Sequence, residues 1–338
     1  MKRRHLGRAL AMVIFVAVVV SYFIPLPYYV TKPGMAKELA PIIKVEDGYK
    51  ESGDFKLTTI SMGEANVFTY GLAKLMKYWD IYREDEIRGE EETDKQYEMR
   101  QLQEMEGSKV KAIISAYREA GKSYTPIYRG VYVYGIVAGL PAEKVLEVGD
   151  RITEVDGQRF TSSKQFIHYV SGKRAGKTLK LEIIRDKQAL QKEVQLAKLP
   201  KTGKVGMGIV LVDDVAVKTE PKVTIDTAKI GGPSAGLMFT LEIYNQLVKE
   251  DITKGKDIAG TGTMDENGNV GPIGGIHQKV VAADKSGAEV FFAPNEKGEA
   301  GSNYSVAKKT AEDINTDMKI VPVDTLQDAL DYLEKMKK

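Results

Sequence analysis

Two residues far apart in the chain have the types and surroundings that nucleophilic catalysis needs. Ser234 lies in a run of small residues, 231–236, directly before an apolar stretch that predicts a helix over 233–249. The free N–H groups and the positive end of such a helix would stabilise an oxyanion formed beside the serine. Serine is also a common helix cap, so this position alone is equally consistent with a structural role.

Lys279 is the candidate base for this serine. It lies within a predicted helix over 276–286, with Ile276 three residues before it and Ala282 and Ala283 three and four residues after it. A lysine on the apolar face of a helix is unusual. Burial lowers the pKa of an amine, and a neutral amine can accept the proton of a serine hydroxyl.

Two alternatives to a serine–lysine pair are open from the residues alone. The ammonium group of Lys279 could extend past the alanines into solvent, which would make this lysine an ordinary surface residue. Ser234 could instead use His277 as its base, although no histidine in the sequence has the aspartate–histidine setting of a Ser-His-Asp triad.

The composition of the 338 residues argues against several other kinds of chemistry. The absence of cysteine excludes disulfides, a thiol nucleophile and thiolate metal ligands, and the three histidines lack metal-ligand spacing. We therefore expect no metal and no cofactor. A net charge of +2 does not favour nucleic acid as a partner. The run Gly172–Thr178 resembles a phosphate-binding loop but has only three residues between its glycines, so ATP is not expected either.

The N-terminus predicts a membrane anchor. Lys2, Arg3, Arg4 and Arg8 precede an uncharged, mainly apolar stretch over 9–31, which is long enough for a transmembrane helix of roughly 20 residues. We place this helix at 9–30. The positive flank puts the tail 1–8 in the cytoplasm and the rest of the chain outside, as a single-pass protein of the cell membrane. A cleaved signal peptide is the alternative.

The middle of the chain resembles a known binding module. A strand over 130–137 is followed by Gly139-Leu140-Pro141-Ala142, Gly149-Asp150-Arg151-Ile152 and Val155-Asp156-Gly157. This order of motifs is similar to bacterial PDZ domains and implies a small, mostly-β PDZ-like domain at 109–199. Residues 31–108 would form a membrane-proximal region of strand and helix.

The PDZ resemblance implies a peptide-binding groove. An extended peptide would add as a strand along Gly130, Val131, Tyr132 and Val133, with a helix over 162–170 as the other wall. A Gly-Leu-Gly-Phe-like loop, which would bind a terminal carboxylate, is expected just before this strand. The chain has Tyr128-Arg129-Gly130 there, so a free C-terminus and an internal segment are both possible ligands.

From about residue 200 strands alternate with helices, and the motifs there resemble those of the Lon proteases. They are Gly232-Pro233-Ser234-Ala235-Gly236, Thr261-Gly262, Pro272-Ile273-Gly274-Gly275-Ile276-His277-Gln278-Lys279 and Pro294-Asn295. The resemblance implies an α/β (α+β) Lon-type proteolytic domain at 200–338. It also implies that Ser234 is the nucleophile and Lys279 the general base, that Thr261 orients the lysine amine, and that the N–H groups of Ser234 and Gly232 form the oxyanion hole.

These observations predict a membrane-anchored serine endopeptidase of Lon type that works without ATP. Its PDZ domain would recruit membrane or secreted protein substrates for quality control or regulated proteolysis, and the chains could assemble into a homo-oligomer. The alternative is a protein of another class, a membrane-anchored PDZ scaffold or peptide-binding chaperone with an inactive peptidase domain.

Overall fold

The computed structural model describes residues 12, 19–50, 52–89, 92–200, 202–228 and 230–337, and the chain divides into two compact units. The first unit comprises Met1–Lys44, Gly48–Glu92 and Ser234–Lys338, and the second comprises Val45–Asp47 and Thr93–Pro233. These units differ from the predicted domains. Most of the region 31–108 belongs to the same unit as the C-terminal domain, whereas residues 202–233 belong with the PDZ-like region.

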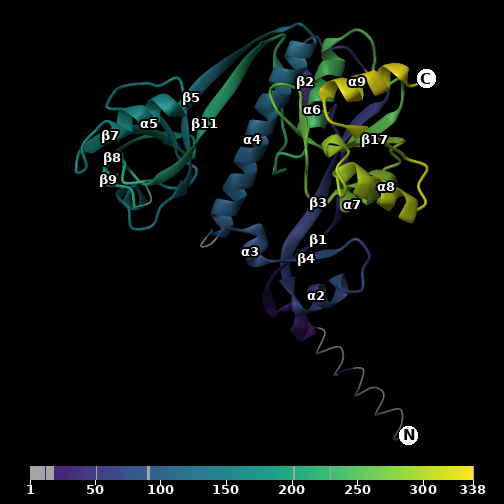
Figure 1. The fold of residues 1–338 in the computed structure, drawn as a ribbon, viewed down its shortest axis with the longest axis horizontal. Coiled ribbons are helices and arrows are strands. Elements are labelled where there is room, and N and C mark those ends of the chain that lie inside the picture. The colour runs from purple at the N-terminus through teal and green to yellow at the C-terminus, as the bar shows by residue number, and fades with distance from the viewer. Residues whose placement is uncertain are drawn as a thin grey trace, which may run out of the picture. The chain divides into compact units, whose positions relative to one another are not determined.

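Within the described residues, the first unit is built on a six-stranded sheet in the order β17-β16-β13-β3-β1-β4, of which β17, β3, β1 and β4 are labelled in Figure 1. Its strands are β1 (Pro25–Glu38), β3 (Asp54–Asn66), β4 (Asp80–Arg83), β13 (Asp257–Gly260), β16 (Val290–Pro294) and β17 (Lys319–Val323). Strands β3, β13, β16 and β17 run parallel, and β1 is antiparallel to both of its neighbours. The N-terminal segments therefore supply half of the sheet that carries the C-terminal domain.

Helices cover both faces of this sheet. The other elements of the first unit are α2 (Val67–Ala73), α3 (Glu84–Ile87), α6 (Gly236–Leu247), β14 (Thr263–Met264), β15 (Val270–Gly271), α7 (Ile276–Lys285), a short 3₁₀ turn (Glu296–Gly298), α8 (Asn303–Asp313) and α9 (Leu326–Lys335). Every residue of β16 is buried. Phe291 packs in the core of α7 and α8, and Phe292, on the opposite face, contacts the ring of Tyr332 in α9. Burial on both faces explains why this strand is an uninterrupted apolar run.

The predicted transmembrane helix at 9–30 is wrong in its last eight residues, since residues 23 and 24 are already not helical. Residues 25–30 form the start of β1, where Pro25 pairs with Asn66 and Tyr29 pairs with Glu64. Pro25 and Pro27 explain the change, because proline interrupts helical hydrogen bonding. Residues 1–11 and 13–18 lie outside the described residues. In the part of the chain that the structure describes, no helix is long and apolar enough to cross a membrane.

The second unit contains an antiparallel sheet in the order β11-β5-β6-β7-β8. Its strands are β5 (Ser123–Ile136), β6 (Arg151–Val155), β7 (Thr178–Arg185), β8 (Gln188–Gln195) and β11 (Ile209–Glu220). The remaining elements are α4 (Asp94–Glu119), a 3₁₀ turn (Pro141–Lys144), α5 (Ser163–Ser171), β9 (Ala197–Lys198), β10 (Val205–Gly206), β12 (Val223–Ile225) and β2 (Ile43–Val45), which lies at the unit boundary. Helix α4 begins at a capping box of Thr93 and Gln96.

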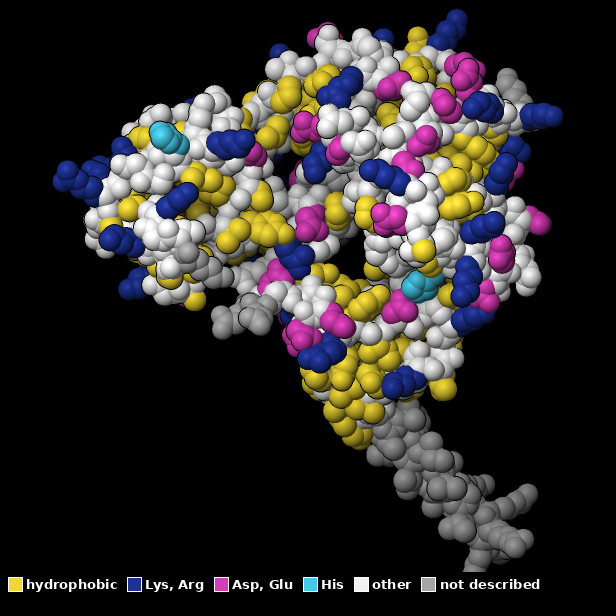
Figure 2. All heavy atoms as spheres, viewed as in Figure 1, with side chains coloured by type: hydrophobic (Ala, Val, Ile, Leu, Met, Phe, Trp, Pro, Cys, Tyr) yellow, Lys and Arg dark blue, Asp and Glu magenta, His cyan; other side chains and the backbone are white. Residues whose placement is uncertain are grey.

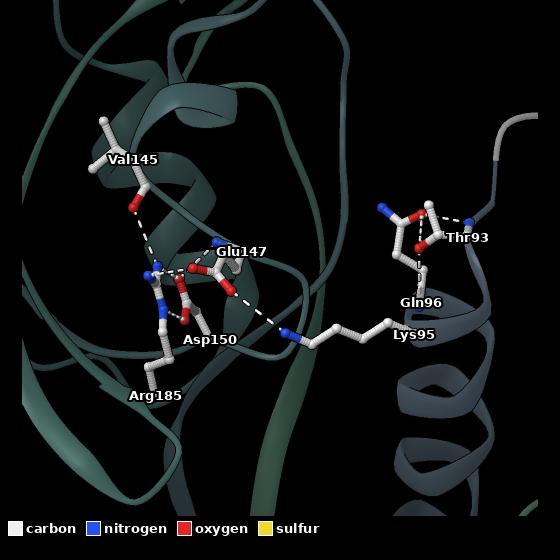
Figure 3. A network of polar contacts seen from close by, with 7 residues as sticks. All are labelled: Thr93, Lys95, Gln96, Val145, Glu147, Asp150 and Arg185. Carbon is white, nitrogen blue, oxygen red and sulfur yellow. Dashed lines mark hydrogen bonds and ion pairs between the residues drawn. The ribbon is translucent and has the colours of Figure 1, made fainter.

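A buried ion pair organises the turn before β6 in the second unit (Figure 3). The carboxylate of Asp150, which is fully buried, accepts two hydrogen bonds from Arg185 and one from the N–H of Glu147. Arg185 also pairs with Glu147 at 2.6 Å, and Lys95 of α4 lies 3.6 Å from the other oxygen of that carboxylate. The Gly-Asp motif thus has a structural role, because Asp150 accepts hydrogen bonds both from the backbone of the turn and from the half-buried guanidinium of Arg185.

We expect Asp150→Ala to destabilise the second unit by roughly 1.5–3 kcal/mol, because Arg185 and the N–H of Glu147 would lose a charged hydrogen-bond acceptor, while Arg185 keeps Glu147. Arg159→Ala is the matched control, since Arg159 is 82% exposed and pairs with Glu154 at 2.6 Å. Its loss should cost less than about 1 kcal/mol. Hydrogen exchange of the β6 and β7 amides in the full chain measures both changes. Equal effects of the two substitutions would contradict the structural role of Asp150.

Candidate active site

Ser234 lies in a turn directly before helix α6, not at its cap. The N-cap of α6 is Ala235, and its cap carries no side-chain hydrogen bond. The carbonyl of Ser234 accepts hydrogen bonds from the N–H of Gly262 at 2.9 Å and from Thr261 Oγ1 at 3.0 Å. These contacts fix the serine backbone and leave its hydroxyl free of a capping role. The helix-cap alternative is therefore wrong for Ser234.

Lys279 lies on helix α7 and points into the first unit. The N-cap of the helix is Gly275, which has φ 67°, and the helix packs through Ile276, Val280 and Ala283 into the core beside β13 and β16. This packing buries Lys279 to 3% exposure. The alternative in which its amine extends into solvent is thus wrong.

The amine of Lys279 lies between two hydroxyl groups. Its Nζ is 2.7 Å from Ser234 Oγ and 3.0 Å from Thr261 Oγ1. Thr261, at the end of β13, is buried and donates its one hydroxyl proton to the Ser234 carbonyl. A threonine hydroxyl has a single donor, so towards Lys279 it can only accept. When neutral, the amine can therefore donate to Thr261 and direct its lone pair at the Ser234 hydroxyl.

The Lys279 amine is buried without a counter-ion, and this burial lowers its pKa. Among the described residues, no carboxylate lies within ion-pair distance of its Nζ. Desolvation lowers the pKa of Lys279 from 10.5 to about 7. Lys56 illustrates the contrast, because this lysine is also buried but pairs with Asp257 at 2.7 Å. A large part of the Lys279 amine is consequently neutral near pH 7, as a general base requires.

His277 lies on the same helix but has a different partner. Its Nε2 is 2.9 Å from Asp80 Oδ2 at the start of β4, and the same oxygen accepts a hydrogen bond from Gln278. This aspartate could not be predicted from local sequence, because Asp80 and His277 are brought together only by the packing of α7 on the sheet. His277 therefore has an acidic partner, whereas the hydroxyl of Ser234 is bonded to Lys279.

Gly232, a predicted oxyanion donor, has its N–H in another hydrogen bond. It belongs to the second unit, where its N–H donates to the carbonyl of Gln101 in α4 at 2.9 Å. Its φ of 86° is one that glycine readily adopts. The neighbouring Pro233 carbonyl accepts a hydrogen bond from Ser108 at 3.1 Å. The residues before the nucleophile are thus bound to α4, and the predicted role of Gly232 as an oxyanion donor stays a prediction.

The predicted peptide-binding strand in the second unit lies inside its sheet. Val131 pairs with Asp213 of β11 on one side and with Ile152 of β6 on the other. Gly130 packs so closely on β6 that an added Cβ would lie 2.2 Å from the Ile152 carbonyl oxygen. Val131 and Val133 are buried in the core, and Tyr132 is paired on both sides. No peptide can add along Gly130, Val131, Tyr132 and Val133, so this prediction is wrong.

Among the described strands, β11 is one of the two edges of this sheet, and β8 is the other. Strand β11 is preceded by Gly206-Met207-Gly208, in which Met207 is buried and added Cβ atoms on the glycines would meet Leu199 and Leu140 at 2.9 and 2.4 Å. The N–H of Ser163 donates to Asp213, which ties the start of α5 to β11. The loop before β11 therefore has the features expected of a PDZ carboxylate-binding loop, a hydrophobic residue between two glycines. The prediction placed such a loop before residue 130, where the chain has Tyr128-Arg129-Gly130.

Two known protein families match separate parts of the chain. Residues 108–196 match the PDZ domain family, and residues 226–335 match the Lon protease (S16) C-terminal proteolytic domain. Lon protease of Metamycoplasma arthritidis is 33% identical over 31% of this chain and 12% of its own length. Lon protease of Campylobacter concisus is 38% identical over 29% of this chain and 11% of its own length. This chain therefore spans only a small part of these relatives.

One solved structure is similar to part of this chain. The PDZ domain of the SdrC-like protein from Listeria monocytogenes is 41% identical, and the match covers 25% of this chain and 90% of that chain with a TM-score of 0.25. The two family matches define what the chain contains: a part similar to PDZ domains and a part similar to the proteolytic domain of Lon proteases. Its C-terminal domain is of the S16 serine peptidase type.

Replacement of Lys279 by methionine should stabilise the first unit in a pH-dependent way. Between pH 7 and 10.5 the unfolded chain binds a proton at this lysine and the folded chain does not, so wild-type stability rises by up to about 1.4 kcal/mol per pH unit. Lys279→Met removes this dependence and should be most stabilising at and below pH 7. Lys285→Met, an exposed change on the same helix, is the control.

Urea unfolding followed through Trp79 measures this effect, because Trp79 is the single tryptophan of the chain and lies in the first unit. The advantage of Lys279→Met over the wild type should shrink steadily from pH 7 to pH 10. An advantage that is the same at every pH would rule out a desolvated amine at this position.

Proposed function

We propose that the protein is an ATP-independent serine endopeptidase in which Ser234 is the nucleophile and Lys279 the general base. The observation that carries this proposal is the 2.7 Å contact between Lys279 Nζ and Ser234 Oγ in a site where burial lowers the pKa of the lysine to about 7. Nucleophile and base lie within hydrogen-bond reach, and the base is oriented by a third group, Thr261.

The proposed reaction follows from these contacts. Neutral Lys279 accepts the Ser234 proton while Oγ attacks the substrate carbonyl carbon. Collapse of the tetrahedral intermediate breaks the C–N bond, and the Lys279 ammonium protonates the leaving amine. Water activated by the same amine then hydrolyses the acyl-enzyme. The backbone N–H of Ser234 is the proposed donor to the oxyanion, and Gly232 could contribute only after its N–H leaves Gln101.

We also propose that the second unit recruits substrates at β11 and not at β5. An extended segment would pair with the open edge of β11, with α5 as the other wall and the 206–208 loop near its end. Backbone pairing of this kind selects unstructured segments of proteins. Membrane or secreted proteins are the proposed substrates, because the apolar stretch at 9–24, before β1, favours attachment to the cell membrane with the two units outside.

The second candidate function is a membrane-anchored scaffold or peptide-binding chaperone with an inactive peptidase domain. A scaffold of this kind would use the second unit in the same way as the proposed endopeptidase. The two functions differ only in whether the first unit catalyses peptide-bond hydrolysis. The contact between Lys279 and Ser234 favours the enzyme, since a scaffold has no need for a buried amine without a counter-ion.

Cleavage of an unstructured protein by the full chain tests the proposed activity. Ser234→Ala and Lys279→Ala should each lower kcat by roughly 10³-fold or more, because nucleophile and base act as one unit. His277→Ala is the matched control on α7 and should retain activity within about threefold, since its partner is Asp80. Wild-type rates in Ser234→Ala would refute the assignment, and a severe loss in His277→Ala alone would favour a serine–histidine site.

Peptide binding tests the proposed groove. Ile167 of α5 is 50% exposed, and Ile127 of β5 is a matched control at 45% exposure in the same unit. Ile167→Glu should weaken binding of an extended apolar peptide by about tenfold or more, whereas Ile127→Glu should change it little. Fluorescence anisotropy of a labelled peptide with the full-length Ser234→Ala protein gives both affinities. A larger loss for Ile127→Glu would place the groove elsewhere.

A further inference from the structure

The first unit exposes an apolar tip where β1 begins. The tip consists of five side chains that are between 41% and 75% exposed: Tyr22, Phe23, Ile24, Val67 and Phe68. The N–H of Val67 donates to the carbonyl of Ile24 at 3.2 Å, and the rings of Tyr22 and Phe23 lie 5.6 Å apart. Figure 2 shows hydrophobic side chains gathered at this end of the unit. The two segments therefore form one continuous surface.

Helix α2 holds its part of the tip in a fixed position. Asn66 and Thr69 form a capping box at its start, and its inner side packs with Val30 in a small core that includes Ala73 and Tyr70. Val67 and Phe68 point away from that core and are 41% exposed each. The helix is thus apolar on its inner face and again at its exposed first turn. Large exposed apolar patches usually mark a surface that binds a partner.

The charge pattern around the tip indicates the kind of partner. Residues 9–31 contain no charged side chain, and neither do residues 65–73, which include all of α2. The first charged residue after α2 is Lys74, which is exposed with its ammonium 5.2 Å from the ring of Tyr70. Aromatic and aliphatic side chains bordered by lysine are typical of protein surfaces at the boundary between lipid and water.

We propose that the apolar tip inserts into the surface of a lipid bilayer, so that the first unit touches the membrane through α2 as well as through the N-terminal segment. This inference rests on the proposed membrane attachment. It commits to lipid and not to a second copy of the chain, because the uncharged stretch from residue 9 continues directly into Tyr22, Phe23 and Ile24. If that stretch enters a bilayer, the tip lies at the bilayer surface. The peptidase site would then be held at a fixed distance from the membrane.

Site-specific labelling of the full chain tests the proposal, because the wild type contains no cysteine. Phe68→Cys carries an environment-sensitive fluorophore, and Tyr49→Cys is the control, since Tyr49 is 50% exposed in the same unit. The proteins are reconstituted into phosphatidylcholine and phosphatidylglycerol vesicles with a lipid that bears a nitroxide near its headgroup. Flotation measures vesicle binding separately.

Nitroxide lipid should lower the fluorescence at position 68 to about half or less and leave position 49 nearly unchanged. If the protein floats with the vesicles but position 68 is not quenched, the inserted tip is refuted while the proposed membrane attachment stands. If the protein does not float, both fail. A blue shift at position 68 that depends on protein concentration without quenching would assign the tip to contact between copies, which also overturns the proposal.

Discussion

The burial of one amine without a counter-ion is the constraint on which the first unit depends. Lowering the pKa of Lys279 from 10.5 to about 7 means that the folded protein disfavours the ammonium by several kcal/mol. The packing of α7 against the sheet through Ile276, Val280 and Ala283 offsets this unfavourable free energy. The N-terminal strands take part, because the side chain of Gln278 on the same helix donates to Asp80 of β4 and to Thr31 of β1. Segments at the start of the chain therefore help to position the base near its end.

The nucleophile is positioned by its backbone. Gly262 and Thr261 bind the Ser234 carbonyl, and the N–H of Leu237 donates to the carbonyl of Gly262 at 3.1 Å. The start of α6 is thus tied to the end of β13, and Thr261 serves both the serine and the lysine. The residues before Ser234 are bound within the second unit by Ser108 and Gln101. Serine and lysine are therefore aligned, whereas the donor at Gly232 is engaged elsewhere.

The sequence predicted the parts of the site that depend on local pattern. Helical spacing around Lys279 was enough to expect its burial, and the ordered motifs were enough to expect Thr261 nearby. Sheet order is a long-range property, and there the predictions failed. Nothing local to Val131 distinguishes a central strand from an edge strand, and both read as alternating apolar residues. The pairing of β1 and β3 with the C-terminal strands was missed for the same reason, as was the aspartate beside His277.

The titration of the Lys279 side chain tests the central claim most directly. Lysine labelled with carbon-13 at Cε can be followed by NMR in the full-length protein, and Lys279→Met identifies the signal of this residue. The account predicts a midpoint near pH 7 for Lys279. A midpoint near 10.4, the ordinary value for lysine, would show that the amine is solvated or paired, and the account of this site as a serine–lysine peptidase centre would be contradicted.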